Sequence, residues 1–332
     1  MKNQILISML ILFSFNIQAQ DYWIEKSFTD SVSINNIAIN SVNEIFVTAT
    51  YYDPDIQWWI GLVYYSNDDG NTWIIKTPYY NFHEIIDVLI DSEDNIYLGT
   101  WTGGIYKSVD SGNTWEEKNS GLTNICPTSL AINSEGWLYA GHFWGGGIDY
   151  SENGGDEWIQ INYPLCGYGI RGLGVSLNDY IFVDASNYST DNGNTWSTID
   201  EGLSVSVLIN QVWYSFNTNN EVFLGTVEGI YYLYSCDSTW EKILSTDGYV
   251  YDIIINSENK IYAGSSDGVF YSENNGQDWQ LINEQFSSFP PGKFSFDSDG
   301  YLWAVGFNVI YKSKYIINKK FRECKNLPKS TF

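Results

Sequence analysis

Apolar and polar residues alternate along most of this chain in short runs separated by Asn, Asp, Ser and Gly. One pattern, an apolar strand, a polar turn and a second apolar strand, occurs seven times. Its copies are INSVNEIF (39–46), IDSEDNIY (90–97), INSEGWLY (132–139), VSLNDYIF (175–182), FNTNNEVF (216–223), INSENKIY (255–262) and FDSDGYLW (296–303). Such runs around turn-forming residues predict β-hairpins. The sequence therefore predicts seven hairpins of one kind.

A second phrase follows each of the first six hairpins and ends in tryptophan. Its copies are SNDDGNTW (66–73), SVDSGNTW (108–115), STDNGNTW (189–196), the looser SENGGDEW (151–158) and SENNGQDW (272–279), and the shortened SCDSTW (235–240). The tryptophans recur every 38 to 44 residues, which is the length of one four-stranded propeller blade. Each unit is therefore predicted to contain an inner hairpin and an outer hairpin, and the outer turn carries the phrase. The shortened copy predicts a different turn.

The seventh hairpin is followed by only one apolar run, VIYKS (309–313), so its blade lacks a strand. Near the N-terminus, DYWIEKSF (21–28) reads like the segment after each repeat tryptophan. We expect residues 21–28 to pair beside VIYKS and to close the ring without an open sheet edge. The predicted fold is all-β: a seven-bladed β-propeller of four-stranded antiparallel blades over residues 21–315.

The tryptophan phrase resembles the Asp-box, or BNR repeat, S-x-D-x-G-x-T-W. The resemblance implies a turn between the third and fourth strands of a blade. In such a turn an Asp or Ser side chain accepts backbone N–H bonds, Gly supplies a positive φ and Trp packs between blades. This predicts a structural role for Asp68, Gly70, Trp73, Asp110, Gly112, Trp115, Gly155, Trp158, Asp191, Gly193, Trp196, Trp240, Gly276 and Trp279. The alternative, that the aspartates bind calcium or act as catalytic acids, is disfavoured because Asn153 and Asn274 replace the acid by an amide.

The two ends of the chain differ from the repeats. Residues 1–20 contain one lysine, an apolar run over 5–15 and then small and polar residues, which predicts a secretory signal peptide whose apolar core is too short for a membrane anchor. We expect an exported protein that is extracellular, on the cell surface or periplasmic. Residues 316–332 are predicted to be a basic, disordered tail. Export permits disulfides, so Cys126 and Cys166 either pair or stay as free thiols.

Charge removes several classes of function. The chain has 40 acidic and 16 basic residues, a net charge of -24, which disfavours nucleic acid and anionic lipid as partners. With only two histidines, a histidine-rich metal site is not credible. No nucleophile elbow or phosphate-binding loop is present. We expect a monomer with no cofactor, no metal, no nucleic-acid partner and no membrane insertion.

The resemblance covers enzymes and binding proteins. Sialidases of this superfamily bind the sugar carboxylate with three arginines, whereas this chain has only Arg171 and Arg322, so sialidase activity is not expected. Xyloglucan hydrolases place their carboxylates between two propellers, and this chain has residues for one. Sortilin and the photosystem II assembly factors are binding proteins, although the arginine-rich patch of the assembly factors is missing here.

On propellers the functional surface usually lies opposite the phrase turns, on the loops joining strands two and three and on the crossings between blades. The residues there that we assign to binding are Tyr51, Trp58, Trp101, His142, Trp144, Tyr168, Arg171, Asp267 and Phe307. Aromatic rings beside carboxylates suit a neutral sugar or a peptide. The preferred function is non-catalytic binding of a glycan or protein partner, with no catalytic residue assigned.

Two alternatives remain. Many of these aromatic residues could simply pack between blades. The chain could also be a carbohydrate-active enzyme with a carboxylate pair chosen from Asp53, Asp55, Asp184, Glu228 and Asp267, because glycosidases need two carboxyl groups about 5 to 9.5 Å apart.

Overall fold

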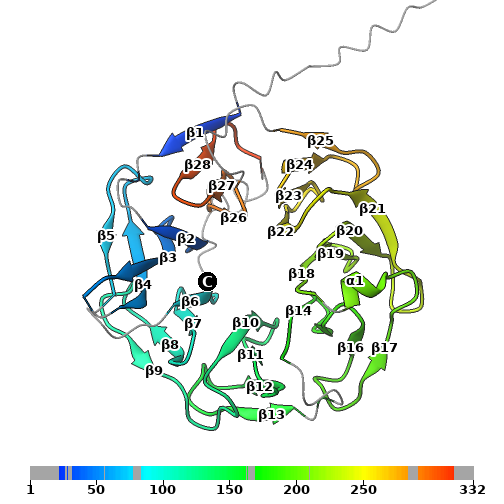
Figure 1. Cartoon of the computed structure of the whole chain (residues 1–332), viewed down its shortest axis with the longest axis horizontal. Helices are drawn as coiled ribbons and strands as arrows, with labels where there is room; N and C mark the ends of the chain where they lie inside the picture. Colours follow the sequence, from blue (N-terminus) through cyan, green and yellow to red (C-terminus); the bar gives the residue numbers. More distant parts are fainter. Residues whose placement is uncertain are drawn as a thin grey trace, which may run out of the picture.

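The computed structural model describes residues 22–26, 28, 32–55, 57–77, 84–161, 163, 169–208, 210–282 and 291–317. Their strands form seven four-stranded antiparallel sheets, which stand as blades around a central opening (Figure 1). This confirms the predicted seven-bladed propeller. The alternation of apolar and polar residues produces it, because each blade buries both faces against its neighbours while its turns stay polar.

In blades 1 to 6 the four strands follow one another from the centre of the ring to its rim. Blade 1 contains β2 (Ser33–Ile39), β3 (Ile45–Asp53), β4 (Trp58–Ser66) and β5 (Ile74–Ile75); blade 2 contains β6 (Ile85–Ile90), β7 (Ile96–Thr100), β8 (Gly104–Ser108) and β9 (Glu116–Glu117). Blade 3 contains β10 (Pro127–Ile132), β11 (Leu138–His142), β12 (Ile148–Ser151) and β13 (Ile159–Ile161); blade 4 contains β14 (Leu173–Val175), β15 (Ile181–Val183), β16 (Asn187–Ser189) and β17 (Ser197–Thr198). Blade 5 contains β18 (Trp213–Phe216), β19 (Val222–Thr226), β20 (Gly229–Leu233) and β21 (Glu241–Ser245); blade 6 contains β22 (Val250–Ile255), β23 (Ile261–Ser265), β24 (Gly268–Ser272) and β25 (Gln280–Leu281). The short helix α1 (Val205–Leu208) lies in the crossing between blades 4 and 5.

Blade 7 joins the two ends of the described chain. It contains β26 (Lys293–Phe296), β27 (Leu302–Val305), β28 (Ile310–Ser313) and, at its rim, β1 (Trp23–Lys26). β1 pairs antiparallel with β28, from Trp23 opposite Ser313 to Lys26 opposite Ile310. The predicted closure by the N-terminal segment is confirmed, and it removes the free sheet edge that an incomplete blade would expose.

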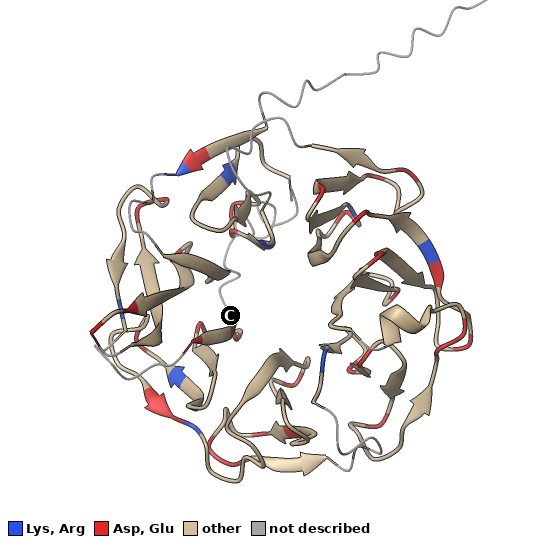
Figure 2. Cartoon of the chain, viewed as in Figure 1, with Lys and Arg blue, Asp and Glu red and all other residues tan. Residues whose placement is uncertain are grey.

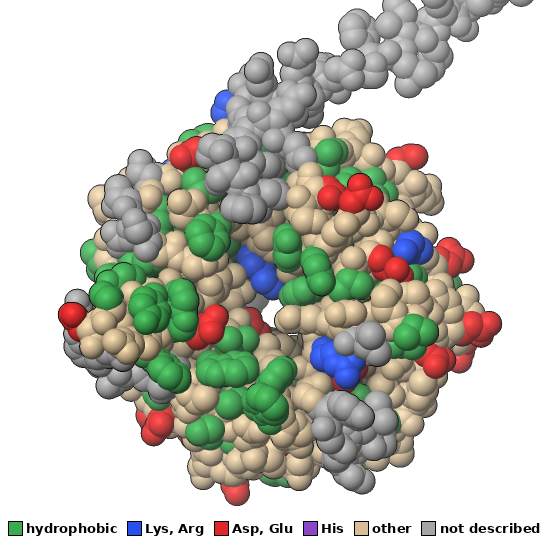
Figure 3. Space-filling model, in the orientation of Figure 1, with side chains coloured by type: hydrophobic (Ala, Val, Ile, Leu, Met, Phe, Trp, Pro, Cys, Tyr) green, Lys and Arg blue, Asp and Glu red, His purple; other side chains and the backbone are tan. Residues whose placement is uncertain are grey.

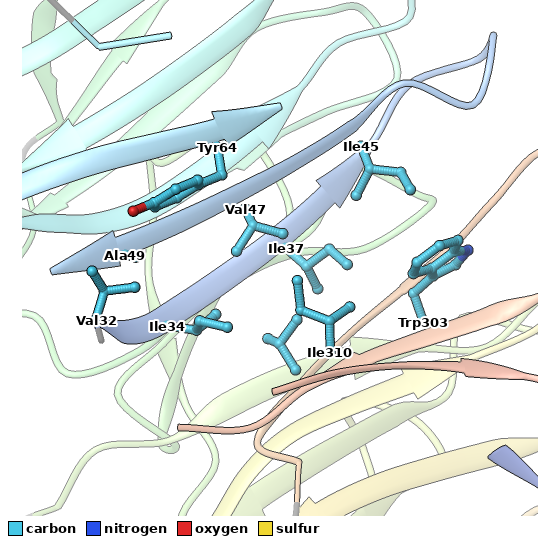
Figure 4. Close-up of a cluster of buried hydrophobic side chains, with 10 residues drawn as sticks. Val32, Ile34, Ile37, Ile45, Val47, Ala49, Tyr64, Trp303 and Ile310 are labelled. Carbon is cyan, nitrogen blue, oxygen red and sulfur yellow. The ribbon is translucent and has the colours of Figure 1, made fainter. Parts of the chain in front are cut away.

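The hydrophobic core is divided into seven clusters, one at each seam between neighbouring blades. Figure 4 shows the cluster at the seam between blades 7 and 1, where Trp303 and Ile310 pack against Ile37, Ile45 and Val47. At about 25 cal/mol per Å² of apolar surface removed from water, these seams supply the main favourable term for folding. The core is thus a ring of contacts around the central opening.

The propeller has two faces of different construction. The turns between strands one and two, and between strands three and four, lie on one face, called here the turn face. The loops between strands two and three, together with the crossings from blade to blade, lie on the other, called the loop face. Figures 1 to 3 view the molecule from the loop face.

The tryptophan phrases form the turns between strands three and four, called here the repeat turns. In blade 1, the Asp68 carboxylate accepts the backbone N–H of Asn71 and Thr72 at 3.1 and 2.9 Å and the Thr72 hydroxyl at 2.6 Å. The Ser66 hydroxyl accepts the backbone N–H of Gly70, whose φ is +69°. These contacts satisfy the turn's own polar groups, as the turn chemistry of Asp, Ser and Gly leads one to expect.

The other repeat turns vary this pattern. Where Asn replaces Asp, at Asn153 and Asn274, the side-chain oxygen still accepts the backbone N–H four residues on, at 3.0 and 2.9 Å. The shortened copy in blade 5 has a different turn, in which Ser235 and Ser238 bond to each other. Its Trp240 is nevertheless buried and donates its indole N–H to Ile199 O of the preceding blade at 3.0 Å. A turn that accepts an amide in place of the acid depends on hydrogen bonding more than on charge.

Near the ends, the described chain packs as far as Ile317, past Tyr315, where the propeller was predicted to end. Ile317 is buried, and its backbone oxygen accepts the Asn256 amide at 3.0 Å. The predicted signal peptide, 1–20, and the rest of the predicted tail lie outside the described residues. Cys126 is a buried free cysteine, in line with the free-thiol alternative for that residue, and Cys166 lies outside the described residues.

Candidate functional site

The hairpin of blade 1 extends furthest on the loop face. β3 and β4 have nine residues each, whereas the second and third strands of the other blades have three to five. At about 3.3 Å per residue, the additional length carries the hairpin roughly 13 Å further. Its end carries four exposed aromatic side chains: Tyr51, Tyr52, Trp58 and Trp59. Tyr52 and Trp59 face each other across the strands, with ring centroids 5.1 Å apart.

A second aromatic group lies over blades 2 and 3. Trp101 contacts Phe143 and Phe143 contacts Trp144, with ring centroids 5.4 and 4.9 Å apart. Trp144 is 73% exposed, and its backbone φ is +56°, in the left-handed region that bulky side chains rarely adopt. The three residues come from the two loops that join strands two and three of these blades, so the fold brings together side chains that lie far apart in the sequence.

A cavity of about 530 Å³, called here the hairpin cavity, opens beside the blade 1 hairpin. Its walls come from blades 1, 2 and 7. They consist of Val32, Ser33, Asn35, Thr50, Tyr51, Tyr52, Trp59, Glu84, Phe307 and Asn308. Four aromatic rings with a few neutral polar groups and one carboxylate form the mixture that is typical of small-ligand sites.

Two further cavities adjoin it at the centre of the ring. One, of about 470 Å³, is lined by the first strands of all seven blades and is called the central cavity. The other, of about 430 Å³, lies between blades 5, 6, 7 and 1. Asn35 lines all three cavities, and Phe307 lines two of them. Figure 3 shows hydrophobic side chains gathered around the central opening on this face. Together they form one depression with an aromatic margin.

The half-buried residues Asp87 and Asp252 line the central cavity, together with Glu84, Lys293 and Arg171. Asp87 accepts the backbone N–H of Leu130 in the next blade at 2.8 Å, and Asp252 accepts that of Phe294 at 3.0 Å. Burial raises the pKa of both carboxyl groups, and the positive charge of Lys293 opposes that rise. These carboxylates connect neighbouring blades at the axis. Figure 2 shows how few basic residues lie near the opening.

The sequence did not single out Asp87, Asp252, Lys293 or Glu84. Each of the two aspartates lies inside an otherwise apolar first strand, IIDVLI (85–90) and VYDIII (250–255). A polar residue within an apolar first strand was the sequence signal that could have identified them. The same signal occurs in blade 1 at Asn36, whose amide donates to Ile86 O at 2.9 Å. The sequence does not show that Asp87, Asp252 and Lys293, from blades 2, 6 and 7, line one cavity at the axis.

The residues predicted for binding lie at several different places in the structure. Tyr51 and Phe307 line the hairpin cavity, and Trp58, Trp101 and Trp144 belong to the aromatic groups on the same face. Arg171 lines the central cavity and donates to Leu208 O at 2.9 Å, so it also holds α1 in place. Asp267 lies on the loop of blade 6 and accepts the backbone N–H of Asp247. Tyr168 lies outside the described residues.

His142 does not lie on the binding face where it was predicted. It is the last residue of β11 and is fully buried, with its Nε2 2.8 Å from the carboxylate of Asp149, which is also fully buried. Asp149 accepts the backbone N–H and hydroxyl of Thr123 at 2.8 and 2.9 Å. His142 belongs to β11, all of whose residues are buried, whereas Phe143 and Trp144 follow the strand in its loop and are exposed.

Of the five carboxylates considered for catalysis, those of Asp53, Asp184, Glu228 and Asp267 have local partners. The Glu228 carboxylate accepts the Ser204 hydroxyl at 2.6 Å and lies 3.3 Å from Lys242 Nζ. The hydrogen bonds from Ser204 and Tyr231 lower the pKa of Glu228 to about 2. Asp184 accepts the backbone N–H of Arg171 at 2.6 Å, while burial raises its pKa. Asp53 accepts the backbone N–H of Asp55 at 2.8 Å. These contacts hold loops and the start of α1.

Within the described residues no group of three or more His, Cys, Asp or Glu side chains is placed to hold a metal ion. In the same part of the chain no helix has the length and apolar character needed to cross a membrane.

Comparison with known proteins gives structural neighbours only. No protein-family model matches the sequence, and no curated protein matches it. Virginiamycin B lyase from Staphylococcus aureus is similar in structure, with a TM-score of 0.71 and 13% identity over 89% of this chain and 99% of that one. At this level of identity the likeness concerns the fold.

Two further neighbours share the propeller. The extracellular domain of the putative hybrid two-component system BT4673 from B. thetaiotaomicron has a TM-score of 0.70 and 14% identity, over 89% of this chain; the chain spans 40% of that domain's length. YCF48 from Cyanidioschyzon merolae has a TM-score of 0.61 and 14% identity, over 88% of this chain and 98% of that one. YCF48 is also known bound to the D1 peptide, and that structure has a TM-score of 0.64.

Proposed function

We propose that this chain is an exported, non-catalytic binding protein that recognises a glycan or protein partner through the depression on its loop face. One observation carries the proposal: exposed aromatic side chains from blades 1, 3 and 7, with the half-buried Trp101 of blade 2, surround or line that depression. Exposing large apolar rings forgoes the stabilisation that burial would give, and contiguous exposed apolar patches mark interaction sites.

The backbone of Trp144 supports this proposal. A tryptophan in the left-handed region costs on the order of 1 kcal/mol or more, and here the cost is not offset by burial because the side chain is 73% exposed. Gly145 and Gly147 next to it also have positive φ, so glycine would fit the local backbone better. A strained and exposed ring is explained by contact with a partner.

The neighbours are compatible with such a role. The BT4673 match is an extracellular domain, and YCF48 binds a peptide. Export of this chain is proposed from the apolar segment of residues 1–20. Non-catalytic binding is preferred because Asp53, Asp184 and Glu228 are engaged in holding the loops.

The test is a binding screen with the mature protein, on a glycan array and on an array of extended peptides, beside the Trp101→Ala/Trp144→Ala double variant. We expect loss of binding in the double variant, about tenfold or more, since each aromatic contact is worth roughly 1 kcal/mol. Tyr234→Ala is the matched control, because Tyr234 is a 69% exposed aromatic residue beside the repeat turn of blade 5.

Two results would count against the proposal. Binding that survives in the double variant and is lost in Tyr234→Ala would move the site to the turn face. Cleavage of a bound glycan, abolished by Asp267→Asn while binding is kept, would favour the enzymatic alternative.

A further inference from the structure

The described residues that line the hairpin cavity carry one sign of charge. Glu84 is charged, and none of the other described lining residues is Lys, Arg or His. Four aromatic rings, those of Tyr51, Tyr52, Trp59 and Phe307, surround the same space. Aromatic faces carry negative potential, so rings and carboxylate together favour a positive group and disfavour an anion.

Glu84 lines both the hairpin cavity and the central cavity. Its backbone oxygen is fixed by the Trp101 N–H at 2.8 Å, while its carboxylate makes no hydrogen bond or ion pair with another described residue. Asp87, Asp184 and Glu228, by contrast, are bonded to backbone N–H groups, hydroxyls or Lys242. The backbone of Glu84 is therefore held in place, and its carboxylate has no bonding partner among the described residues.

Elsewhere in the protein, lysine ammonium groups lie beside aromatic rings. Lys76 lies 4.5 Å from the ring centroid of Tyr65, and Lys312 lies 4.2 Å from that of Tyr301. Lys312 also contacts the carboxylate of Asp297 at 3.3 Å, so an ammonium group there has both a ring and an acid as neighbours. The described lining of the hairpin cavity offers rings and an acid and contains no lysine.

The charge of the whole molecule acts in the same direction. A net charge of -24 attracts basic partners over long range and speeds their association at low salt. Two basic residues, Lys293 and Arg171, line the adjoining central cavity together with Glu84. Lys293 lies near the carboxylates of Asp87 and Asp252 and 5.6 Å from the Trp213 ring, and Arg171 donates to Leu208 O at 2.9 Å.

We infer that the hairpin cavity binds a lysine or arginine side chain of a basic protein segment, with Glu84 as the counter-charge and the Tyr52 and Trp59 rings as the walls. This inference rests on the proposed function, binding through the loop face, and names its partner class. A neutral glycan would use the same rings but would gain little from Glu84, which makes the two kinds of ligand separable.

The experiment titrates fluorescent, end-capped peptides of repeating Gly-Ser-Lys, Gly-Ser-Arg, Gly-Ser-Gln and Gly-Ser-Glu units into the full mature protein at low ionic strength. The Lys and Arg peptides should bind, and Glu84→Gln should weaken them about tenfold, because a charge-assisted contact is lost. Glu152→Gln is the matched control, since it removes the same charge from an exposed residue in a repeat turn on the turn face. Tetramethylammonium should compete better than sodium at equal ionic strength, because it can occupy an aromatic cage.

The outcomes distinguish this inference from the proposed function. Equal effects of Glu84→Gln and Glu152→Gln, or equal binding of the Gln and Lys peptides, would overturn the cationic site. If a neutral glycan binds and only Trp59→Ala weakens it, the inference fails while the proposed function stands. If neither peptide nor glycan binds in a way that depends on the loop-face aromatic residues, both fail. Circular dichroism of each variant verifies that it is folded.

Discussion

At the scale of single residues, a substitution of Trp144 distinguishes an effect on ligand binding from an effect on stability. Replacing it with glycine relieves a left-handed backbone and removes a side chain that is mostly exposed. Trp144→Gly should therefore leave the free energy of unfolding unchanged or raise it by up to about 1 kcal/mol, while ligand binding is weakened. Thermal melting and the binding assay measure the two effects. A drop of several kcal/mol in stability would mean that the ring has a structural task instead.

The aspartates of the repeat turns predict how stability changes with pH. Hydrogen bonds from the Thr72 hydroxyl and backbone lower the pKa of Asp68 to about 2, from 3.8, and Thr114 and Thr195 lower the pKa of Asp110 and Asp191 in the same way. Because the folded-state pKa is the lower one, this contribution is present above about pH 4 and is lost as the pH falls toward 2.

The test replaces all three aspartates with asparagine. The amide oxygen keeps the backbone bonds, as at Asn153 and Asn274, but cannot titrate. The melting temperature of the triple variant should fall less between pH 5 and about pH 2 than that of the unmodified protein. Identical acid profiles would show that the turn carboxylates do not contribute to acid sensitivity.

His142 shows where reasoning from single residues stops. The sequence places it in a glycine-rich loop of blade 3, yet β11 extends to include it and turns it into the interior beside Asp149. Strand ends shift by a residue or two with packing, and one residue of shift reverses the direction of a side chain. The neighbouring Trp144 was assigned correctly to the surface because the strand had already ended.

At the scale of elements, β1 is the test of ring closure. Trp23 is buried at the seam between blades 6 and 7, and β1 covers the outer edge of β28. Deleting residues 21–28 should unfold or aggregate the protein, since loss of one buried tryptophan already costs about 3 to 5 kcal/mol of a total of about 5 to 15. Melting and size-exclusion chromatography measure the effect.

A matched pair of substitutions in the same strand controls for the deletion. Trp23→Ala should lower stability strongly, whereas Ile24→Ala should change it little because Ile24 is 43% exposed. A truncated protein that stays monomeric with an unchanged melting temperature would contradict the closure.

The elements were predictable because each carries its signal locally. Apolar runs, turn residues and the repeat tryptophans recur in every blade, and the missing strand of blade 7 could be matched to DYWIEKSF by its resemblance to the segments after the tryptophans. The length of the blade 1 hairpin beyond its neighbours was visible as an insertion. The pairing of Tyr52 with Trp59 depended on register, which the sequence alone does not fix.

At the scale of the whole molecule, the ring brings together residues that no local signal connects. Glu84 meets Phe307 and Tyr51 in one cavity, and Asp87 lies near Asp252 and Lys293 at the axis. These juxtapositions depend on the blade count and on the blade twist, so they follow from the assembled propeller and not from any one repeat.

The most direct test of binding through the loop face is oxidative footprinting by mass spectrometry, with and without the first glycan or peptide that binds in the screen. We expect protection of Trp59 and Trp144 on binding, with no change at Tyr234 near the opposite face. Protection at Tyr234 while Trp59 and Trp144 stay fully reactive would contradict this expectation.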